Sequence, residues 1–184
     1  MAAQFTPAFD FLLNSEDSQR KYAEVPDPVP VNEGDSLEVK AAKQTAKAIS
    51  GINSYYHPIA FVGVQSTPQA ARGPLVAEFY EKSFWNPLHL GELASQDLAS
   101  RLLDCAVNQG PGTAVQLLQK AINAVVTFTG ETLVVDGRLG GATLAAANRY
   151  RPQTILDAFR KQRLARYQEV KNPVPAAWAA RANA

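Results

Sequence analysis

Apolar residues recur at helical spacing near the start of the chain. Four of them stand three or four positions apart and share one face of a predicted helix: Phe5, Phe9, Leu12 and Leu13. Glu16 falls on the edge of that face, in the last turn of the helix. Partial burial and the negative end of the helix dipole both disfavour an ionised carboxylate there, whereas a general acid needs a carboxyl that keeps its proton. Taken alone, this stretch favours the simpler interpretation that Glu16 ends the helix and points to water.

A polar, proline-rich stretch follows, from Asp17 to Asp35. Pro26, Pro28 and Pro30 exclude a regular helix and favour extended or turn conformations. Loops of this length are uncommon unless they are functional. Because this one follows Glu16 directly, we expect it to form one wall of a cleft.

The next segments are predicted to alternate between helix and extended chain. A capping box at Asp35 predicts a helix that ends at Gly51. Residues 55–64 are rich in β-branched and aromatic side chains and predict a short extended segment. A further helix is expected over 67–84, with a break at Gly73.

Beyond a junction at about 85–91 the pattern is helical. The predicted elements are a helix within 92–109 that ends at Gly110, a helix after Thr113, a tight turn at 136–143 followed by a short alanine-rich helix, and a long helix over about 153–171. The chain therefore predicts an all-α or α-rich domain of two lobes, with a cleft as the default binding site.

Composition narrows the function classes. The chain has 184 residues, 46% of them hydrophobic, and a formal net charge of +1, which gives no general attraction to nucleic acid. No apolar run approaches the ~20 residues that span a bilayer, and the N-terminus does not read as a secretory signal. The single cysteine, Cys105, excludes an internal disulfide framework and a multi-cysteine zinc site, and we expect it to fill the core. We expect no metal or cofactor.

Acidic residues form the first candidate constellation: Glu16, Glu24 and Asp27. Cleavage of a glycosidic bond usually needs one protonated carboxyl in an apolar setting and one ionised carboxylate in a polar setting. Glu16 fits the first description, and Asp27, between two prolines in a polar loop, fits the second. Acids in polar loops are also common without any such role.

A polar stripe forms the second constellation, at spacings of four, three and four: Asp97, Arg101, Asp104 and Asn108. The simplest interpretation is a solvated helix face with an Asp–Arg pair. The functional alternative is a cleft wall that hydrogen-bonds sugar hydroxyls and amides. The last long helix carries a basic face that is either solvated or attracted to anionic cell-wall polymer: Arg160, Lys161, Arg163, Arg166 and Lys171.

Several motifs in order resemble those of glycoside hydrolase family 108, the phage-type N-acetylmuramidases with a C-terminal peptidoglycan-binding half. The blocks that carry the resemblance are the Tyr–Trp junction at 79–87, LeuLeuAspCysAlaValAsnGlnGly at 102–110, LeuLeuGlnLysAlaIle at 117–122, AspGlyArgLeuGlyGlyAlaThr at 136–143, ArgLeuAlaArgTyr at 163–167 and the tail around Trp178 and Arg181.

The first half is similar to the family at fewer positions. Glu16 stands where the family has the glutamate of a Glu-Gly-Gly motif, and Asp27-Pro28 is similar to the family's Asp-Pro. Gly51-Ile52 matches its Gly-Ile, while Ser50 and Thr45 are the candidates for its threonine. Residues 29–44 are extra.

The resemblance implies an α-rich, lysozyme-like fold with at most a small β element. Its expected lobes are a catalytic lobe at 1–88 and a helical peptidoglycan-binding lobe at 89–184. It implies a muramidase that cuts between N-acetylmuramic acid and N-acetylglucosamine. The expected residues are Glu16 and Asp27 for catalysis, with Glu24 or Ser50 as alternatives to Asp27, and Ser50, Tyr56, Asp104 and Asn108 for substrate binding.

The expected partner is peptidoglycan, with no nucleic acid and no membrane insertion. The protein would be made in the cytoplasm without a signal peptide and act on periplasmic peptidoglycan, as a phage endolysin or as an injected antibacterial toxin with a cognate immunity protein. The alternative function is a catalytically weak peptidoglycan-binding or phage structural module.

Overall fold

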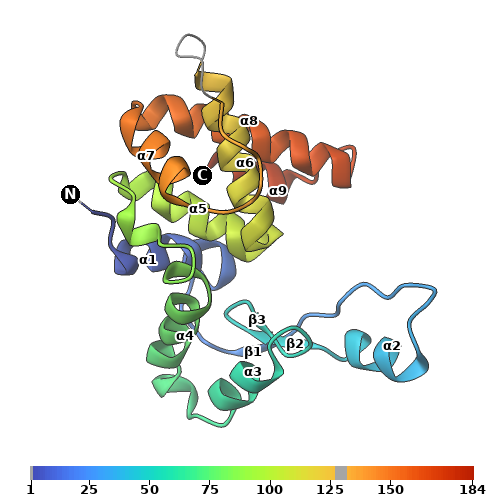
Figure 1. Cartoon of the computed structure of the whole chain (residues 1–184). Helices are drawn as coiled ribbons and strands as arrows, with labels where there is room; N and C mark the ends of the chain where they lie inside the picture. The colour runs from blue at the N-terminus through green and yellow to red at the C-terminus, as the bar shows by residue number, and fades with distance from the viewer. Residues whose placement is uncertain (1, 127–131) are drawn as a thin grey trace. The chain divides into compact units, whose positions relative to one another are not determined.

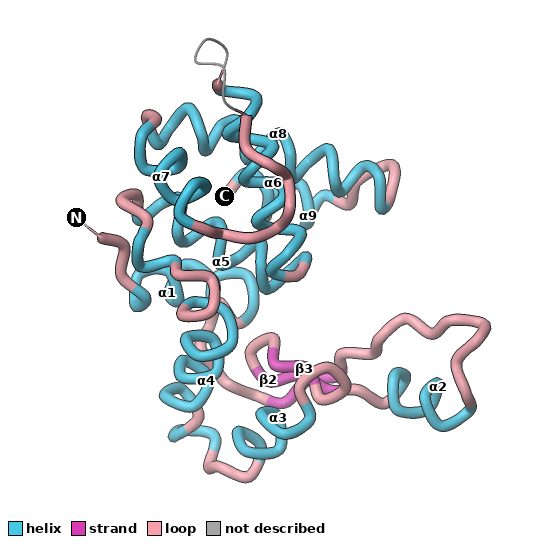
Figure 2. Tube along the Cα trace, viewed as in Figure 1, coloured by secondary structure: helices cyan, strands magenta, loops and turns pink. Residues whose placement is uncertain are grey.

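The computed structural model describes residues 2–126 and 132–184, which are mainly helical (Figure 1). The elements are α1 (Phe5–Glu16), β1 (Glu24–Pro26), α2 (Leu37–Gln44), β2 (Lys47–Ile49), β3 (Ile52–Asn53), α3 (Pro58–Gln65), α4 (Gly73–Tyr80), α5 (Gln96–Gln109), α6 (Pro111–Val125), α7 (Gly141–Arg149), α8 (Pro152–Val170) and α9 (Ala176–Asn183), with short 3₁₀ turns at Gln69–Ala71 and Leu90–Glu92 and a π-helical turn at Glu81–Trp85. Figure 2 shows how little of the chain is strand. The predicted α-rich, lysozyme-like fold class is confirmed.

The chain divides into two compact units. The sheet unit is Leu13–Glu81, and the helical unit is Met1–Leu12 together with Lys82–Ala184. The division therefore falls inside α1, whose first residues belong to one unit and whose last turn belongs to the other. The functional division at residues 88 and 89 stays a prediction.

The sheet unit is built on three short antiparallel strands in the order β1-β2-β3. In the register, Val25 faces Ala48 and Ile49 faces Ile52, so β2 and β3 form a tight hairpin. Between β1 and β2 the chain leaves the sheet as an arm, residues 27–46, that carries α2 (Figure 1). The N–H of Asp27 donates to the carbonyl of Ala46 at 2.9 Å and closes the base of this arm.

The helix predicted from Asp35 to Gly51 is shorter than expected. Its N-cap is Ser36, whose hydroxyl accepts from the N–H of Val39, whereas Asp35 forms an ion pair with Lys43 at 2.7 Å. The helix stops at Gln44 because Thr45 closes it with both its N–H and its hydroxyl on the carbonyl of Ala41. The chain then pairs with β1, so the helical prediction for 47–49 is wrong.

The extended segment predicted at 55–64 is also wrong, since Pro58–Gln65 forms α3. Pro58 lies in the first helical turn, where its missing N–H costs no hydrogen bond. Phe61 and Val64, three positions apart, form the buried face of the helix. The helical spacing of these apolar residues therefore outweighs the β-branched content of the segment. Further along the chain, the predicted break at Gly73 is confirmed, because α4 begins there.

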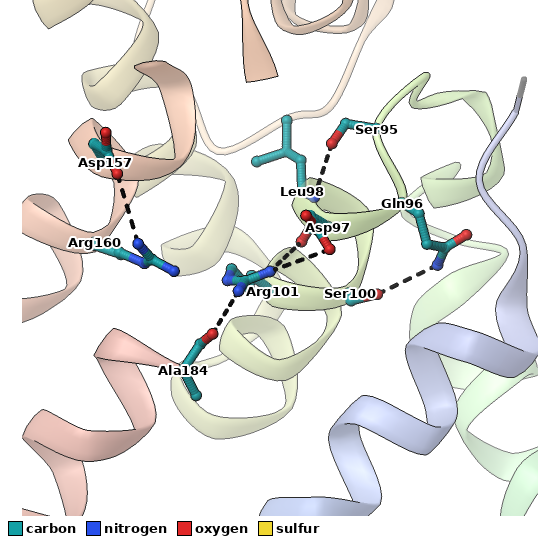
Figure 3. Close-up of polar contacts among 9 residues, drawn as sticks. All are labelled: Ser95, Gln96, Asp97, Leu98, Ser100, Arg101, Asp157, Arg160 and Ala184. Atoms are coloured by element: carbon teal, nitrogen blue, oxygen red, sulfur yellow. Dashed lines mark hydrogen bonds and ion pairs between the residues drawn. The ribbon is translucent and has the colours of Figure 1, made fainter. Parts of the chain in front are cut away.

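The helical unit packs α6 against α5 and along α8, with α7 and α9 against α8 (Figure 1). Ser95 caps α5 by accepting from the N–H of Leu98 (Figure 3). Gly110, with φ +89°, ends the helix, as predicted. Cys105 is fully buried in α5 and fills the core, as expected. Burial raises the pKa of its thiol to about 12.

Candidate functional site

The carboxyl group of Glu16 lies at the turn of the β2–β3 hairpin. Glu16 is the last residue of α1 and is half-buried. A Cβ added to Gly51 would stand 2.5 Å from Oε2 of Glu16 and 2.6 Å from the hydroxyl oxygen of Tyr80. The glutamate carboxyl, the glycine and the tyrosine hydroxyl therefore converge on one point, with Gly51 leaving the space that the carboxyl needs.

Ser50 builds this turn from the inside. It has a positive φ of 47°, which is uncommon for a residue with a side chain. Its hydroxyl donates to Oδ2 of Asp17 at 2.8 Å, and its carbonyl accepts from the hydroxyl of Tyr80 at 2.8 Å. Ser50 is 4% exposed. The hydroxyl and the carbonyl of Ser50 therefore both hold the turn. Its predicted role in substrate binding stays a prediction.

Asp17 connects the end of α1 to the same turn. Its carboxylate accepts from the backbone N–H groups of Lys21 and Tyr22, at 3.0 and 2.7 Å, as well as from Ser50. Partial burial acts to raise the pKa of Asp17, but the donors on Tyr22, Ser50 and Lys21 outweigh it and hold the pKa below its ordinary value. Asp17 is therefore an ionised residue that fixes the loop after Glu16.

Asp27 is exposed at the base of the arm and is held by Asn53 on β3. The side-chain amide of Asn53 donates to Oδ2 of Asp27 at 2.7 Å and to its backbone carbonyl at 2.9 Å. Gly51, in the turn, and Asn53, at the end of β3, lie two residues apart on the hairpin. The hairpin thus carries the contacts of both predicted catalytic carboxyls.

Glu24, the alternative partner, has less freedom. It lies on β1, where one carboxylate oxygen accepts from Lys47 and the other from Gln65. The hydrogen bond from Lys47, then that from Gln65, holds the pKa of Glu24 below its ordinary value. Its carboxylate is therefore ionised and already paired on both oxygens.

Tyr56, one of the predicted substrate-binding residues, is open to solvent, with 61% of its surface exposed. Its ring packs edge-on against Tyr55, with centroids 5.3 Å apart. Its backbone N–H donates to Oδ1 of Asn53 at 3.4 Å, so Tyr56 contacts the side chain that also holds Asp27.

Asp104 does not face solvent, contrary to the prediction that it lines a cleft. It is fully buried in the helical unit, where Oδ2 pairs with Arg163 at 2.7 Å and Oδ1 with Arg181 at 2.8 Å. The buried pair of Asp104 and Arg163 joins α5 to α8, and the pair of Asp104 and Arg181 joins α5 to α9. Asp104 is thus a structural ion-pair residue. Arg163 is also buried, so it is not part of the solvated basic face predicted for the last long helix.

The other members of the polar stripe stay near the surface. Arg101 pairs with Asp97 at 3.6 Å, as the spacing predicts, and also donates to the carbonyl of Ala184 (Figure 3). Asn108 is exposed, and its side-chain oxygen accepts from the hydroxyl of Tyr167 at 2.6 Å. The candidate residues thus fall in two places: Glu16, Asp27, Ser50 and Tyr56 in the sheet unit, and Asn108 in the helical unit.

Three residues that support the site were not singled out from the sequence: Asp17, Asn53 and Tyr80. In the sequence, Asn53 is marked as a candidate by its position directly after Gly51-Ile52. Asp17 is marked by its position directly after Glu16. Among the described residues, no group of three or more His, Cys, Asp or Glu side chains is placed to hold a metal ion. No described helix combines the length and apolar character of a membrane span.

Two protein-family models match the chain. Residues 41–110 match Glycosyl hydrolase 108, and residues 113–177 match a predicted peptidoglycan domain. The first match includes Ser50, Tyr56 and Asn108, while Glu16 and Asp27 precede it. No curated protein matches the chain. The two matches, in this order, support a glycoside hydrolase that acts on peptidoglycan.

Proposed function

We propose that the protein is an N-acetylmuramidase that cuts peptidoglycan between N-acetylmuramic acid and N-acetylglucosamine. The observation that carries the proposal is the contact of the Glu16 carboxyl with Gly51 beside the Tyr80 hydroxyl. A half-buried carboxyl at a helix C-terminus, fixed against a turn, suits a general acid that protonates the leaving glycosidic oxygen.

Asp27 is the proposed second group. It is exposed and ionisable, and Asn53 orients it. It would stabilise the positive charge that develops on the sugar ring or position a water molecule. Glu24 suits this role less because both of its oxygens are paired, and Ser50 because its hydroxyl already donates to Asp17.

Digestion of isolated sacculi tests the proposal. Wild-type protein should release products with new reducing muramic ends, detected by mass spectrometry. Glu16→Gln should lower the rate about 100-fold or more, since general acid catalysis contributes about 10²–10⁴. The matched control is Glu38→Gln, the same chemical change at an exposed position on α2.

Two results would count against the proposal at different levels. If wild-type protein binds sacculi without releasing reducing ends, the protein is a peptidoglycan-binding module. If folded Glu16→Gln releases as much product as wild type, the enzyme stands but the acid is another residue. Comparing Asp27→Asn with Glu24→Gln then decides between the two candidate partners, since only the variant that lacks the true partner should lose activity.

The proposed place of action is the periplasm, reached as an injected antibacterial toxin or as an endolysin. The arm at 27–46 contains the residues at 29–44 that are extra relative to the family pattern, and this insertion favours the toxin. Expression with a periplasmic leader should lyse a Gram-negative host, whereas expression without one should not. A neighbouring gene for a small periplasmic protein that prevents this lysis would identify the immunity protein, and a neighbouring holin gene would identify an endolysin.

A further inference from the structure

A small pocket opens in the helical unit where the end of α5 meets α8 and α9. Its volume is about 230 Å³, and its lining is Asn108, Gln109, Arg166, Tyr167, Val170 and Trp178. Sites for drug-sized ligands are usually about 300–1,000 Å³, so this pocket takes a fragment the size of one sugar ring. All of the lining residues belong to the same unit.

Two aromatic side chains form one wall of the pocket. The rings of Tyr167 and Trp178 lie with centroids 5.3 Å apart and planes inclined by 43°. The hydroxyl of Tyr167 is fixed by its hydrogen bond to Asn108 at 2.6 Å. Such rings offer an apolar face with a polar edge, which suits a ligand that presents C–H groups on one side and hydroxyls at its rim.

Gln109 supplies a polar group that lacks a partner. Its side-chain Nε2 is shielded from solvent and makes no hydrogen bond. A buried donor left unpaired costs about 1–3 kcal/mol, so such a group in a native protein calls for an explanation. Exchanging the amide N and O would leave an unpaired acceptor instead. Either way, an acetamido group in the pocket would complete the hydrogen bonds of this amide once the Gln109 side chain turns toward it.

We propose that this pocket binds one N-acetylhexosamine unit of the peptidoglycan glycan strand. The acetamido group carries both an N–H donor and a carbonyl acceptor, which match the amide of Gln109, and the sugar ring packs on Trp178. The charged residue of the lining, Arg166, pairs with Glu169 at 3.0 Å, which favours a neutral sugar over the carboxylates of a stem peptide. The inference rests on peptidoglycan as the partner, and it does not depend on the role of Glu16.

Binding of a defined oligosaccharide tests the pocket. The probe is the β-1,4-linked tetramer of N-acetylglucosamine, titrated into the full-length Glu16→Gln protein by calorimetry and by NMR of the tryptophan indole N–H signals. The signal of Trp178, identified by its loss in Trp178→Ala, should shift on binding. Trp178→Ala should weaken binding to the pocket at least tenfold, as expected when a tryptophan anchors the ligand.

Gln109→Leu is the second variant, because Trp178→Ala could loosen α9. Leucine removes the unpaired amide without emptying its space, so the thermal midpoint should be retained or raised while binding falls. Lys161→Gln, which removes an exposed charge from α8 outside the pocket lining, is the control and should bind the tetramer within about twofold of the parent, since loss of an exposed charge changes little.

Three results would overturn the proposal. The first is that the tetramer does not shift the Trp178 signal, and the second is that Gln109→Leu binds the tetramer as tightly as the parent. The third is that the pocket binds a stem peptide instead and that Arg166→Gln abolishes this peptide binding. None of these results bears on the release of reducing ends, so failure of the pocket and failure of the muramidase proposal are distinguishable.

Discussion

The Glu16 carboxyl and Gly51 are packed so closely that residue 51 has no room for a side chain. A Cβ there would stand 2.5 Å from Oε2 of Glu16, and the backbone φ of +84° already disfavours any residue but glycine. The last residue of the first helix is therefore positioned by a hairpin turn that lies far along the sequence.

Gly51→Ala should displace the Glu16 carboxyl. We expect sacculus digestion to fall at least tenfold, and the free energy of unfolding to fall by about 1–2 kcal/mol from the left-handed backbone strain. Gly110→Ala is the matched control, because Gly110 has a similarly positive φ of +89° but nothing lies within 4 Å of the added Cβ. It should lose stability and keep its activity. Equal activity of folded Gly51→Ala and wild type would show that the contact does not position the acid.

Tyr80→Phe should loosen the turn from its other side. The buried hydroxyl of Tyr80 is the donor to the carbonyl of Ser50, so its removal leaves that carbonyl unpaired at a cost of about 1–3 kcal/mol. Urea denaturation measures this loss, and digestion of sacculi should slow at the same time. Tyr22→Phe makes the same chemical change elsewhere in the sheet unit and is the control. A Tyr80→Phe protein as stable as wild type would contradict the role of the hydrogen bond.

Asp17→Asn should change how stability depends on pH. The folded-state pKa of Asp17 is lowered from its ordinary value of 3.8, so its ionised form stabilises the fold above pH 3.8, and this contribution is lost as the pH falls through the lowered folded-state pKa. Wild type should therefore exceed Asp17→Asn in unfolding free energy at pH 7. Urea denaturation at a series of lower pH values should show the gap narrowing. A gap that is constant down to pH 2 would contradict this assignment.

Arg163→Met should strongly destabilise the helical unit. Arg163 and Asp104 are each about 1% exposed and pair at 2.7 Å, and removing one partner of such a pair typically costs about 3–5 kcal/mol. The double variant Arg163→Met/Asp104→Leu should recover part of this loss, because it removes the buried carboxylate that has lost one of its two arginines, while the other, Arg181, is partly exposed. Thermal denaturation followed by circular dichroism compares the two. A double variant less stable than the single one would show that the carboxylate is not the source of the cost.

The local helix signals were sufficient where the chain makes its own helix. The apolar spacing of 5–16 predicts α1, and Gly110 predicts the end of α5. They failed at 47–49, where strand pairing with Glu24–Pro26 overrides the helix pattern, because spacing along the chain does not report which segments meet. At 55–64 the β-branched content misled, although the spacing of Phe61 and Val64 and the proline in the first helical turn are local signals of α3.

By itself, the sequence determined the α-rich fold class, the helix that ends at Glu16 and the ordered motifs similar to a muramidase family. Only the tertiary structure decided which residues surround that glutamate and which polar residues of α5 are buried. Asp104 and Asn108 lie one helical turn apart on the same stripe, yet the first is sealed between two arginines and the second borders a pocket. The physical reason is that burial and charge pairing depend on α8 and α9, whose side chains reach α5 only when the chain has folded.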